Sequence, residues 1–96
     1  MEPIVLHVTY TGTEGRAAAF ASAMCAGALR DAVRAEDGCL RYDYYLPVGG
    51  DGNTALLIEC WRDQAALDRH SSGAAMAQLK ALKASYDLTT EIQRIG

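Results

Sequence analysis

The order of strand-like and helix-like stretches is the feature of this sequence that most limits its possible folds. Four stretches are rich in β-branched, aromatic or alternating apolar residues, as strands are: residues 4–10, 39–46, 54–61 and 86–95. Two regions repeat apolar residues every three or four positions, as helices do: residues 14–35, and residues 64–84 with a break at Ser71-Ser72-Gly73. The order is therefore β-α-β-β-α-β.

This order predicts one α+β domain over residues 1–96 with the ferredoxin-like arrangement, in which helices cover one face of an antiparallel sheet. A chain of 96 residues has the length of one domain. The loop at residues 47–53 contains a proline and three glycines, so we expect it to join the second and third strands as an antiparallel hairpin.

Polar residues and glycines mark the expected ends of the helices. Each helix has a capping residue before it: Thr11 or Thr13 with Glu14 for the first, Asp63 for the second, and a serine of 71–72 for the last. Gly38 is expected to end the first helix in the left-handed conformation. The buried face of that helix is predicted to contain Ala17, Phe20, Ala21, Met24, Ala28 and Ala32.

Both faces of the predicted sheet carry apolar residues. In the third strand Leu56, Ile58 and Cys60 share one face, and Ala55, Leu57 and Trp61 share the other with Glu59. Helices cover only one face, and 17 of the 96 residues are alanines, concentrated in the helical stretches, which add little core of their own. We therefore expect a homodimer in which a second copy covers the other face. A monomer with an apolar sheet face is the alternative.

Charge and cysteine content exclude several functions. The net charge of −3 gives no basic surface for nucleic acid, and no apolar stretch reaches the roughly 20 residues that span a membrane. The acidic N-terminus does not resemble a signal peptide, so a cytoplasmic protein is expected. Cys25, Cys39 and Cys60 have no metal-binding spacing and are expected to be buried apolar residues.

His70 is the strongest candidate for chemistry. It shares a helix face with Ala66 and Leu67, so it is expected at the mouth of an apolar pocket, where an imidazole binds or deprotonates a phenol near neutral pH. The alternative is a histidine that donates to a free carbonyl at the end of its helix. His7 is far from His70 in the sequence, so no metal site is expected.

Three further positions in the strands are candidates. Trp61 either forms the wall of an aromatic pocket or fills the core, and Glu59 either acts as an acid–base group or pairs with Arg41 across the hairpin, which is the favoured interpretation. The hairpin register, and so the face that Glu59 takes, stays open. Tyr42 and Tyr44 share a face and either line a pocket or pack across strands.

His7 points either to the dimer seam or to the pocket. It stands in the first strand, on the face opposite Leu6 and Val8.

Three segments together resemble the antibiotic biosynthesis monooxygenase domain. Gly38-Cys-Leu-Arg-Tyr-Asp-Tyr-Tyr45 matches its Gly-x-Leu-x-Tyr strand, Leu57-Ile-Glu-Cys-Trp61 its Glu-x-Trp strand end, and Asp63-Gln-Ala-Ala-Leu-Asp-Arg-His70 its Ala-Leu-x-x-His helix. The resemblance implies a dimeric α+β barrel with a pocket between helices and sheet in each subunit. It is less close to the haem-degrading branch, because the first strand has His7 and no asparagine and the last helix has no histidine.

The resemblance also implies an activity. Members of the family include oxygenases that use no metal or flavin, in which a phenol or quinol reduces O₂ after losing a proton. The expected reaction is monooxygenation of a small aromatic polyphenol or quinol without a cofactor. It would use His70 as base or anion anchor, Trp61 and Tyr44 as walls and Glu59 as a polar support. A phosphorylated substrate is disfavoured, because no cationic cluster is expected in the pocket. The alternative is a non-catalytic dimeric module that binds a small ligand.

Overall fold

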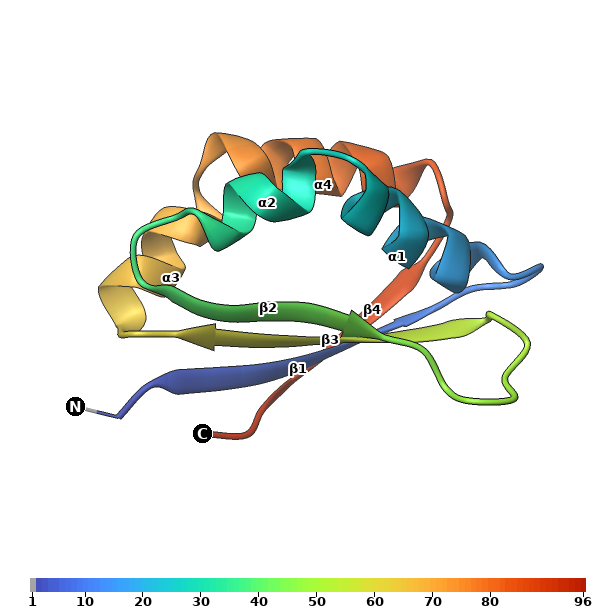
Figure 1. The fold of residues 1–96 in the computed structure, drawn as a ribbon, viewed down its shortest axis with the longest axis horizontal. Helices are drawn as coiled ribbons and strands as arrows, with labels where there is room; N and C mark the ends of the chain where they lie inside the picture. The colour runs from blue at the N-terminus through green and yellow to red at the C-terminus, as the bar shows by residue number, and fades with distance from the viewer. Residues whose placement is uncertain (1) are drawn as a thin grey trace.

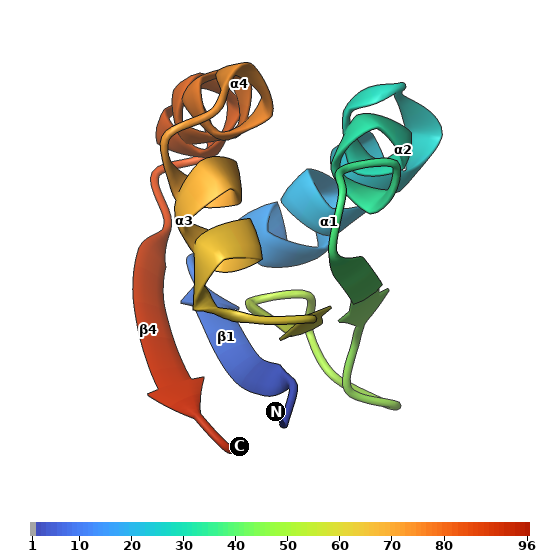
Figure 2. The same ribbon diagram turned by 90° about the vertical axis from the view of Figure 1, so that its left-hand side faces the viewer.

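One antiparallel sheet of four strands lies beneath a single layer of helices (Figures 1 and 2). The structure is a computed structural model that describes residues 2–96. The strands are β1 (Ile4–Thr11), β2 (Cys39–Tyr45), β3 (Thr54–Trp61) and β4 (Thr89–Arg94), in the spatial order β2-β3-β1-β4. The helices are α1 (Arg16–Ala26), α2 (Leu29–Arg34), α3 (Gln64–Ser71) and α4 (Ala74–Ala84). The predicted α+β ferredoxin-like fold is confirmed.

The first helical region differs from its prediction, because it is broken after Ala26 into α1 and α2. Ala17, Phe20, Ala21 and Met24 are buried as expected. Beyond the break at Gly27 the helical phase changes, so Ala28 and Ala32 are exposed and Val33 is buried in their place. The single long helix predicted over 14–35 is therefore wrong in its second half.

Two predicted helix caps are also wrong. No side chain of residues 2–96 caps α1. The helix begins after Gly15, which has a φ of 73° and donates its backbone N–H to Oδ1 of Asn53 over 2.8 Å. No serine side chain caps α4, which begins after Gly73. Asp63 does cap α3, since its carboxylate accepts from the backbone N–H of Ala66 over 2.9 Å.

Gly38 has a φ of 86°, the left-handed conformation expected of it, but it lies in the turn directly before β2, four residues beyond the last residue of α2. The first helical region therefore ends earlier than predicted. Close packing adds a second reason for glycine at this position, because a Cβ on Gly38 would collide with the Cβ of Ala66 in α3.

The helix-facing side of the sheet forms the core. In β3 every second residue is buried, namely Ala55, Leu57, Glu59 and Trp61. This places Glu59 on the helix side, which the sequence left open. The two-residue spacing of Leu40 and Tyr42 predicts that both lie on the buried face of β2. The register shifts between Cys39 and Arg41, however, and Leu40 is 57% exposed.

The opposite face of the sheet carries no helix (Figure 2). It presents half-buried apolar residues from the two central strands: Val5, Leu56, Ile58 and Cys60. The expectation of three buried cysteines is wrong, because Cys25 is exposed and Cys39 and Cys60 are only partly covered. Among the described residues, no helix is long and apolar enough to cross a membrane.

Candidate functional site

A small cavity lies between α4 and the helix-facing side of the sheet. Its volume is about 150 Å³, and it draws side chains from five elements: Val8, Tyr10, Tyr42, Glu59, Met76, Leu79, Lys80, Lys83, Thr90 and Ile92. Its walls are largely apolar, with one carboxyl group and two phenols on the sheet side and two ammonium groups on the helix side. This combination of an apolar volume and a few convergent polar groups is typical of small-molecule sites.

Glu59 is the acidic residue of this cavity. It is 7% exposed, and its Oε1 accepts a hydrogen bond of 2.8 Å from Nε1 of Trp61, two residues along the same face of β3. Burial raises the pKa of Glu59 above its usual range, against the opposing effects of the Trp61 hydrogen bond and of positive charge on His70. Among residues 2–96 no other group donates to this carboxyl group, so Oε2 has no donor there.

His70 lies behind Glu59 and away from the cavity. Its ring stacks on Trp61 with 4.5 Å between ring centroids, and it is 1% exposed. Its Nδ1 lies 3.1 Å from both carboxylate oxygens of Glu36, so a buried imidazole pairs with a half-buried carboxylate. His70 therefore neither lines the cavity mouth nor donates to a helix carbonyl, the two positions that its spacing suggested.

Glu36 was missed by sequence reasoning. It lies in the connection between α2 and β2, where no periodic pattern marks it. The contact with His70 spans 34 residues, so only the folded chain reveals it. Nε2 of His70 has no hydrogen-bonding partner within the described part of the chain.

The tyrosines divide between the cavity and the core around it. Tyr10 and Tyr42 line the cavity, whereas Tyr44 packs against Tyr42 edge to face, with 5.8 Å between their ring centroids. Burial raises the pKa of all three phenols far above the ordinary value, so they are neutral hydrogen-bonding groups at physiological pH. His7 lies on the opposite face of the sheet and shares no cavity with them.

Two lysines correct the expectation that the pocket lacks cations. Lys80 and Lys83 on α4 both line the cavity. Nζ of Lys83 donates to Oγ1 of Thr90 over 2.7 Å, a contact that joins α4 to the edge strand β4. Three residues apart on a helix, the two side chains share one face.

Arg41 does not pair with Glu59, as the hairpin suggested. It lies on the other face of the sheet, where its guanidinium contacts Asp43 and the hydroxyl of Tyr45. The predicted ion pair is therefore wrong, and the only partner of the buried carboxyl group among residues 2–96 is the Trp61 indole.

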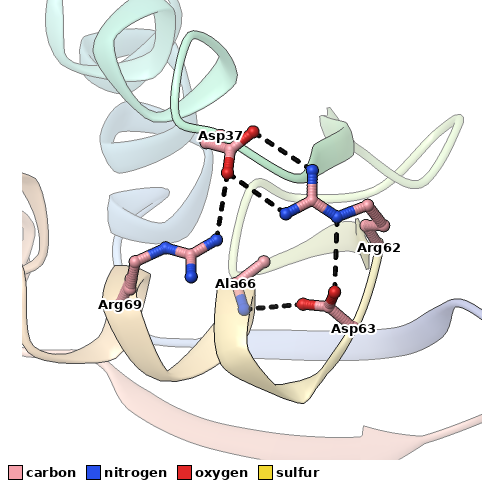
Figure 3. A network of polar contacts seen from close by, with 5 residues as sticks. All are labelled: Asp37, Arg62, Asp63, Ala66 and Arg69. Carbon is pink, nitrogen blue, oxygen red and sulfur yellow. Dashed lines mark hydrogen bonds and ion pairs between the residues drawn. The ribbon is translucent and has the colours of Figure 1, made fainter.

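A surface network holds the start of α3 against the turn that precedes β2 (Figure 3). Both oxygens of Asp37 accept from the Arg62 guanidinium at 3.1 Å, and Arg69 adds a third contact at 3.1 Å. These hydrogen bonds hold the pKa of Asp37 below its usual range. The network helps to position the helix that carries His70, since Arg69 and Asp63 belong to that helix and its cap.

Clustered metal ligands are absent from residues 2–96, where no three histidine, cysteine, aspartate or glutamate side chains come together in a way that could hold an ion. A second depression of about 380 Å³ lies between α2 and the start of α4 and opens widely to solvent. Its charged residues, Glu36, Asp37 and Arg69, are already engaged in the contacts described above.

Comparison with known proteins identifies the family. The family model described as antibiotic biosynthesis monooxygenase matches residues 3–82. Protein PA3566 of Pseudomonas aeruginosa is 31% identical and has a TM-score of 0.79, with 99% of this chain and 93% of that chain covered. A structure described as antibiotic biosynthesis monooxygenase is 22% identical, with a TM-score of 0.75 and coverages of 99% and 97%.

SnoaB, a cofactor-independent oxygenase from Streptomyces nogalater, shares the fold, with a TM-score of 0.81, 14% identity and coverages of 100% and 93%. Among curated proteins, no sequence matches this chain significantly. The family model covers most of the chain. The chain belongs to the antibiotic biosynthesis monooxygenase family.

Proposed function

We propose that this protein is a monooxygenase that needs no cofactor and acts on a small phenol or quinol bound in the cavity under α4. The observation that carries the proposal is the carboxyl group of Glu59, which is buried, has a raised pKa, lacks a donor from residues 2–96 at Oε2 and lines a largely apolar cavity. A base whose pKa lies nearer to the working pH is better suited to accept a proton from a weak acid. Family membership supports an oxygenase of this general kind.

The reaction balances with O₂ as the only co-substrate. The phenol gives its proton to Glu59, and the electron-rich phenolate transfers an electron to O₂. The two radicals then join through a C–O bond at a ring carbon that bears hydrogen. Glu59 returns its proton to the outer peroxide oxygen. The O–O bond breaks, and that oxygen leaves as water with the hydrogen of the ring carbon. A phenol and O₂ thus give a quinone and water: the substrate loses four electrons and O₂ accepts four.

In this proposal the residues behind the cavity position and tune Glu59. The Trp61 indole holds Oε1, which leaves Oε2 to face the substrate. His70 acts through Trp61 and Glu59, because a positive charge on its ring lowers the pKa of the carboxyl group. Tyr42 contacts the substrate, and Tyr44 supports the Tyr42 ring.

We also propose that the protein is a homodimer in which the uncovered sheet faces pack on each other. Val5, Leu56 and Ile58 provide apolar surface on the face without helices. His7 lies on the same face and would stand in the seam between the subunits. Covering this surface would add core to a chain whose helices are rich in alanine.

Oxygen consumption with a panel of hydroquinones and monocyclic phenols tests the function. We expect at least one substrate to consume O₂, and Glu59→Gln to slow that reaction by about 100-fold or more, as the loss of a general base does. Glu91→Gln removes an exposed carboxylate of β4 and is the matched control, which is expected to keep the parent rate.

Two results would contradict the proposal. A Glu59→Gln protein that oxidises every active substrate at the parent rate would exclude Glu59 as the base. Phenols that bind in the cavity without any O₂ uptake would identify the chain as a non-catalytic ligand-binding module of the same fold.

A further inference from the structure

The chain contains two lysines, Lys80 and Lys83, and both line the same cavity. The other seven of the nine lysine and arginine residues are arginines, and none of them is among the described residues that line this cavity. In a protein whose net charge is −3, all of the ammonium groups carried by side chains are therefore placed at one small site. The side chain of Lys83 leaves α4 toward β4, as its contact with Thr90 shows, and Lys80, which is exposed to solvent, lies three residues earlier on the same helix.

No carboxylate in the described part of the chain neutralises either ammonium group. Five arginines form ion pairs with carboxylates: Arg16, Arg30, Arg41, Arg62 and Arg69. Within residues 2–96, no carboxylate lies within ion-pair distance of Lys80 or Lys83. Nζ of Lys83 donates to the uncharged hydroxyl of Thr90 over 2.7 Å. The helix side of the cavity thus carries unpaired positive charge, which favours an anionic ligand.

The size of the cavity limits what that ligand is. A volume of about 150 Å³ is comparable to an engineered apolar cavity that accepts benzene, so it suits one aromatic ring. The apolar side chains of Val8, Met76, Leu79 and Ile92 suit the faces of such a ring. The carboxyl group of Glu59 lies on the sheet side, away from the lysines on the helix.

We propose that the substrate is a monocyclic phenol that carries a carboxylate on a short side arm. The carboxylate binds Lys80, Lys83 and the Thr90 hydroxyl, and the phenol hydroxyl faces Glu59. The orientation of the hydroxyl rests on the proposed function, whereas the carboxylate contact rests on the lysines alone. A carboxylate fits better than a phosphate ester, because the cavity lining offers two ammonium groups and a hydroxyl but no arginine to grip a phosphate bidentately.

Binding without turnover tests the carboxylate contact. Under anaerobic conditions, calorimetry compares 4-hydroxybenzoate, 4-hydroxyphenylacetate and 3-(4-hydroxyphenyl)propionate with their uncharged amides, and a 4-hydroxybenzyl phosphate tests the alternative anion. We expect at least one acid to bind more tightly than its amide and than the phosphate. The lysine variants are measured in the same way. An exposed ion pair contributes up to about 1 kcal/mol, so Lys80→Gln and Lys83→Gln should each weaken acid binding by about three- to fivefold. The double variant should weaken it by about tenfold, and amide binding should not change in any of them.

Arg34→Gln is the matched control for the loss of one positive charge, because Arg34 is exposed on α2 and does not line the cavity. It should leave acid binding at the parent value. A second measurement follows the rate at which acetic anhydride acetylates the lysines. Lys80 and Lys83 are the two lysine side chains of the sequence, so the loss of lysine charge is confined to them. Mass spectrometry should show that the tightest-binding acid slows acetylation of Lys80 and Lys83 and that its amide does not.

The results separate this inference from the proposed function. Any of three results would overturn the carboxylate contact. Acids and amides bind equally, the phosphate binds most tightly, or Arg34→Gln loses as much affinity for the acid as the lysine variants do. Selective acid binding that depends on the lysines but leads to no O₂ uptake in air would overturn the oxygenase proposal and keep the carboxylate site. If the protein oxidises only uncharged phenols, and the lysine variants do so at the parent rate, the oxygenase proposal stands and the carboxylate site is overturned.

Discussion

The indole of Trp61 donates its Nε1 hydrogen to Oε1 of Glu59 over 2.8 Å, two residues away on the same face of β3. Both side chains are buried, and no other donor within residues 2–96 reaches the carboxyl group. This bond fixes one oxygen of Glu59, which lines the cavity, and leaves the other without a donor from the described residues. It therefore connects the packing of the core with the chemistry that the cavity offers.

Trp61→Phe is expected to lower the free energy of unfolding by more than the smaller ring volume of phenylalanine alone would. A hydrogen bond to a charged group contributes about 1.5–3 kcal/mol, and its loss leaves a buried carboxyl group without a donor. Urea unfolding followed by circular dichroism should show a larger cost for Trp61→Phe in the parent than in the Glu59→Leu protein. Equal costs in the two backgrounds would show that the bond does not contribute to stability.

The raised pKa of Glu59 makes stability depend on pH. Its ordinary value is 4.5, and burial raises it in the folded state. As pH rises above the ordinary value, the unfolded chain releases this proton while the folded chain keeps it, so the free energy of unfolding falls until the folded pKa is passed. Glu59→Gln cannot ionise and keeps an acceptor for Trp61, so its stability advantage over the parent should grow with pH and then level off.

Urea unfolding at intervals from about pH 4 to about pH 8 measures this difference. Glu91→Gln, an exposed carboxylate on β4, is the control and should run parallel to the parent. A constant difference between Glu59→Gln and the parent over the whole range would mean that the carboxyl group titrates at the same pH in the folded and unfolded chains.

The pair of His70 and Glu36 provides a further measurable coupling. Glu36→Ala removes the partner of Nδ1, and an unsatisfied buried polar group costs about 1–3 kcal/mol. In the His70→Leu background there is no imidazole to satisfy, so the same substitution should change stability by about 0.5 kcal/mol or less. A double-mutant cycle by urea unfolding gives the coupling energy. A coupling close to zero would show that the pair does not stabilise the fold.

Local patterns predicted much of the fold and little of the site. The alternation along β3 placed Ala55, Leu57 and Trp61 on one face correctly, and the Asp63 cap was found because both depend on neighbours a few residues away. The contact of Glu36 with His70 spans 34 residues, and the approach of α4 to β4 depends on helix packing that no local pattern encodes. Neither could be read from spacing.

The same distinction explains the errors in the elements. The break at Gly27 turned the helical face, so a periodicity read through it assigned Ala32 and not Val33 to the core. The register shift in β2 turned Leu40 outward against a clear alternation. Single glycines and bulges change the phase of a pattern, and their positions depend on tertiary packing.

Gly38→Ala is expected to destabilise the protein through two separate effects. The residue has a φ of 86°, which costs an alanine about 1–2 kcal/mol. Its Cβ would also collide with the Cβ of Ala66, and overpacking of a core typically costs about 1–3 kcal/mol more. Gly49→Ala isolates the first effect, because Gly49 has a φ of 75° and nothing within 4 Å of the added Cβ.

Thermal and urea unfolding of both alanine variants should therefore show the larger loss for Gly38→Ala. Combining it with Ala66→Gly should recover part of the excess and leave the backbone cost. Equal losses at Gly38 and Gly49 would mean that α3 moves away from the turn without resistance.

Ile58→Glu tests the proposed dimer. Ile58 lies in the centre of β3 on the face without helices, between His7 of β1 and Asp43 of β2. A second sheet packed on this face would bury the new carboxylate against apolar surface, which costs far more than leaving it in water. Light scattering after size exclusion at micromolar concentration should give a dimer of about twice 10.3 kDa for the parent and a monomer for the variant.

Ala77→Glu is the matched control for this experiment, because Ala77 is exposed on α4, on the far side of the sheet from Ile58. It adds the same charge and should remain dimeric. Circular dichroism must show that Ile58→Glu keeps its fold; in a monomer its carboxylate would project into water and cost little. A folded Ile58→Glu protein that stays dimeric would place the interface elsewhere, and a monomeric parent would mean that the sheet face stays exposed to solvent.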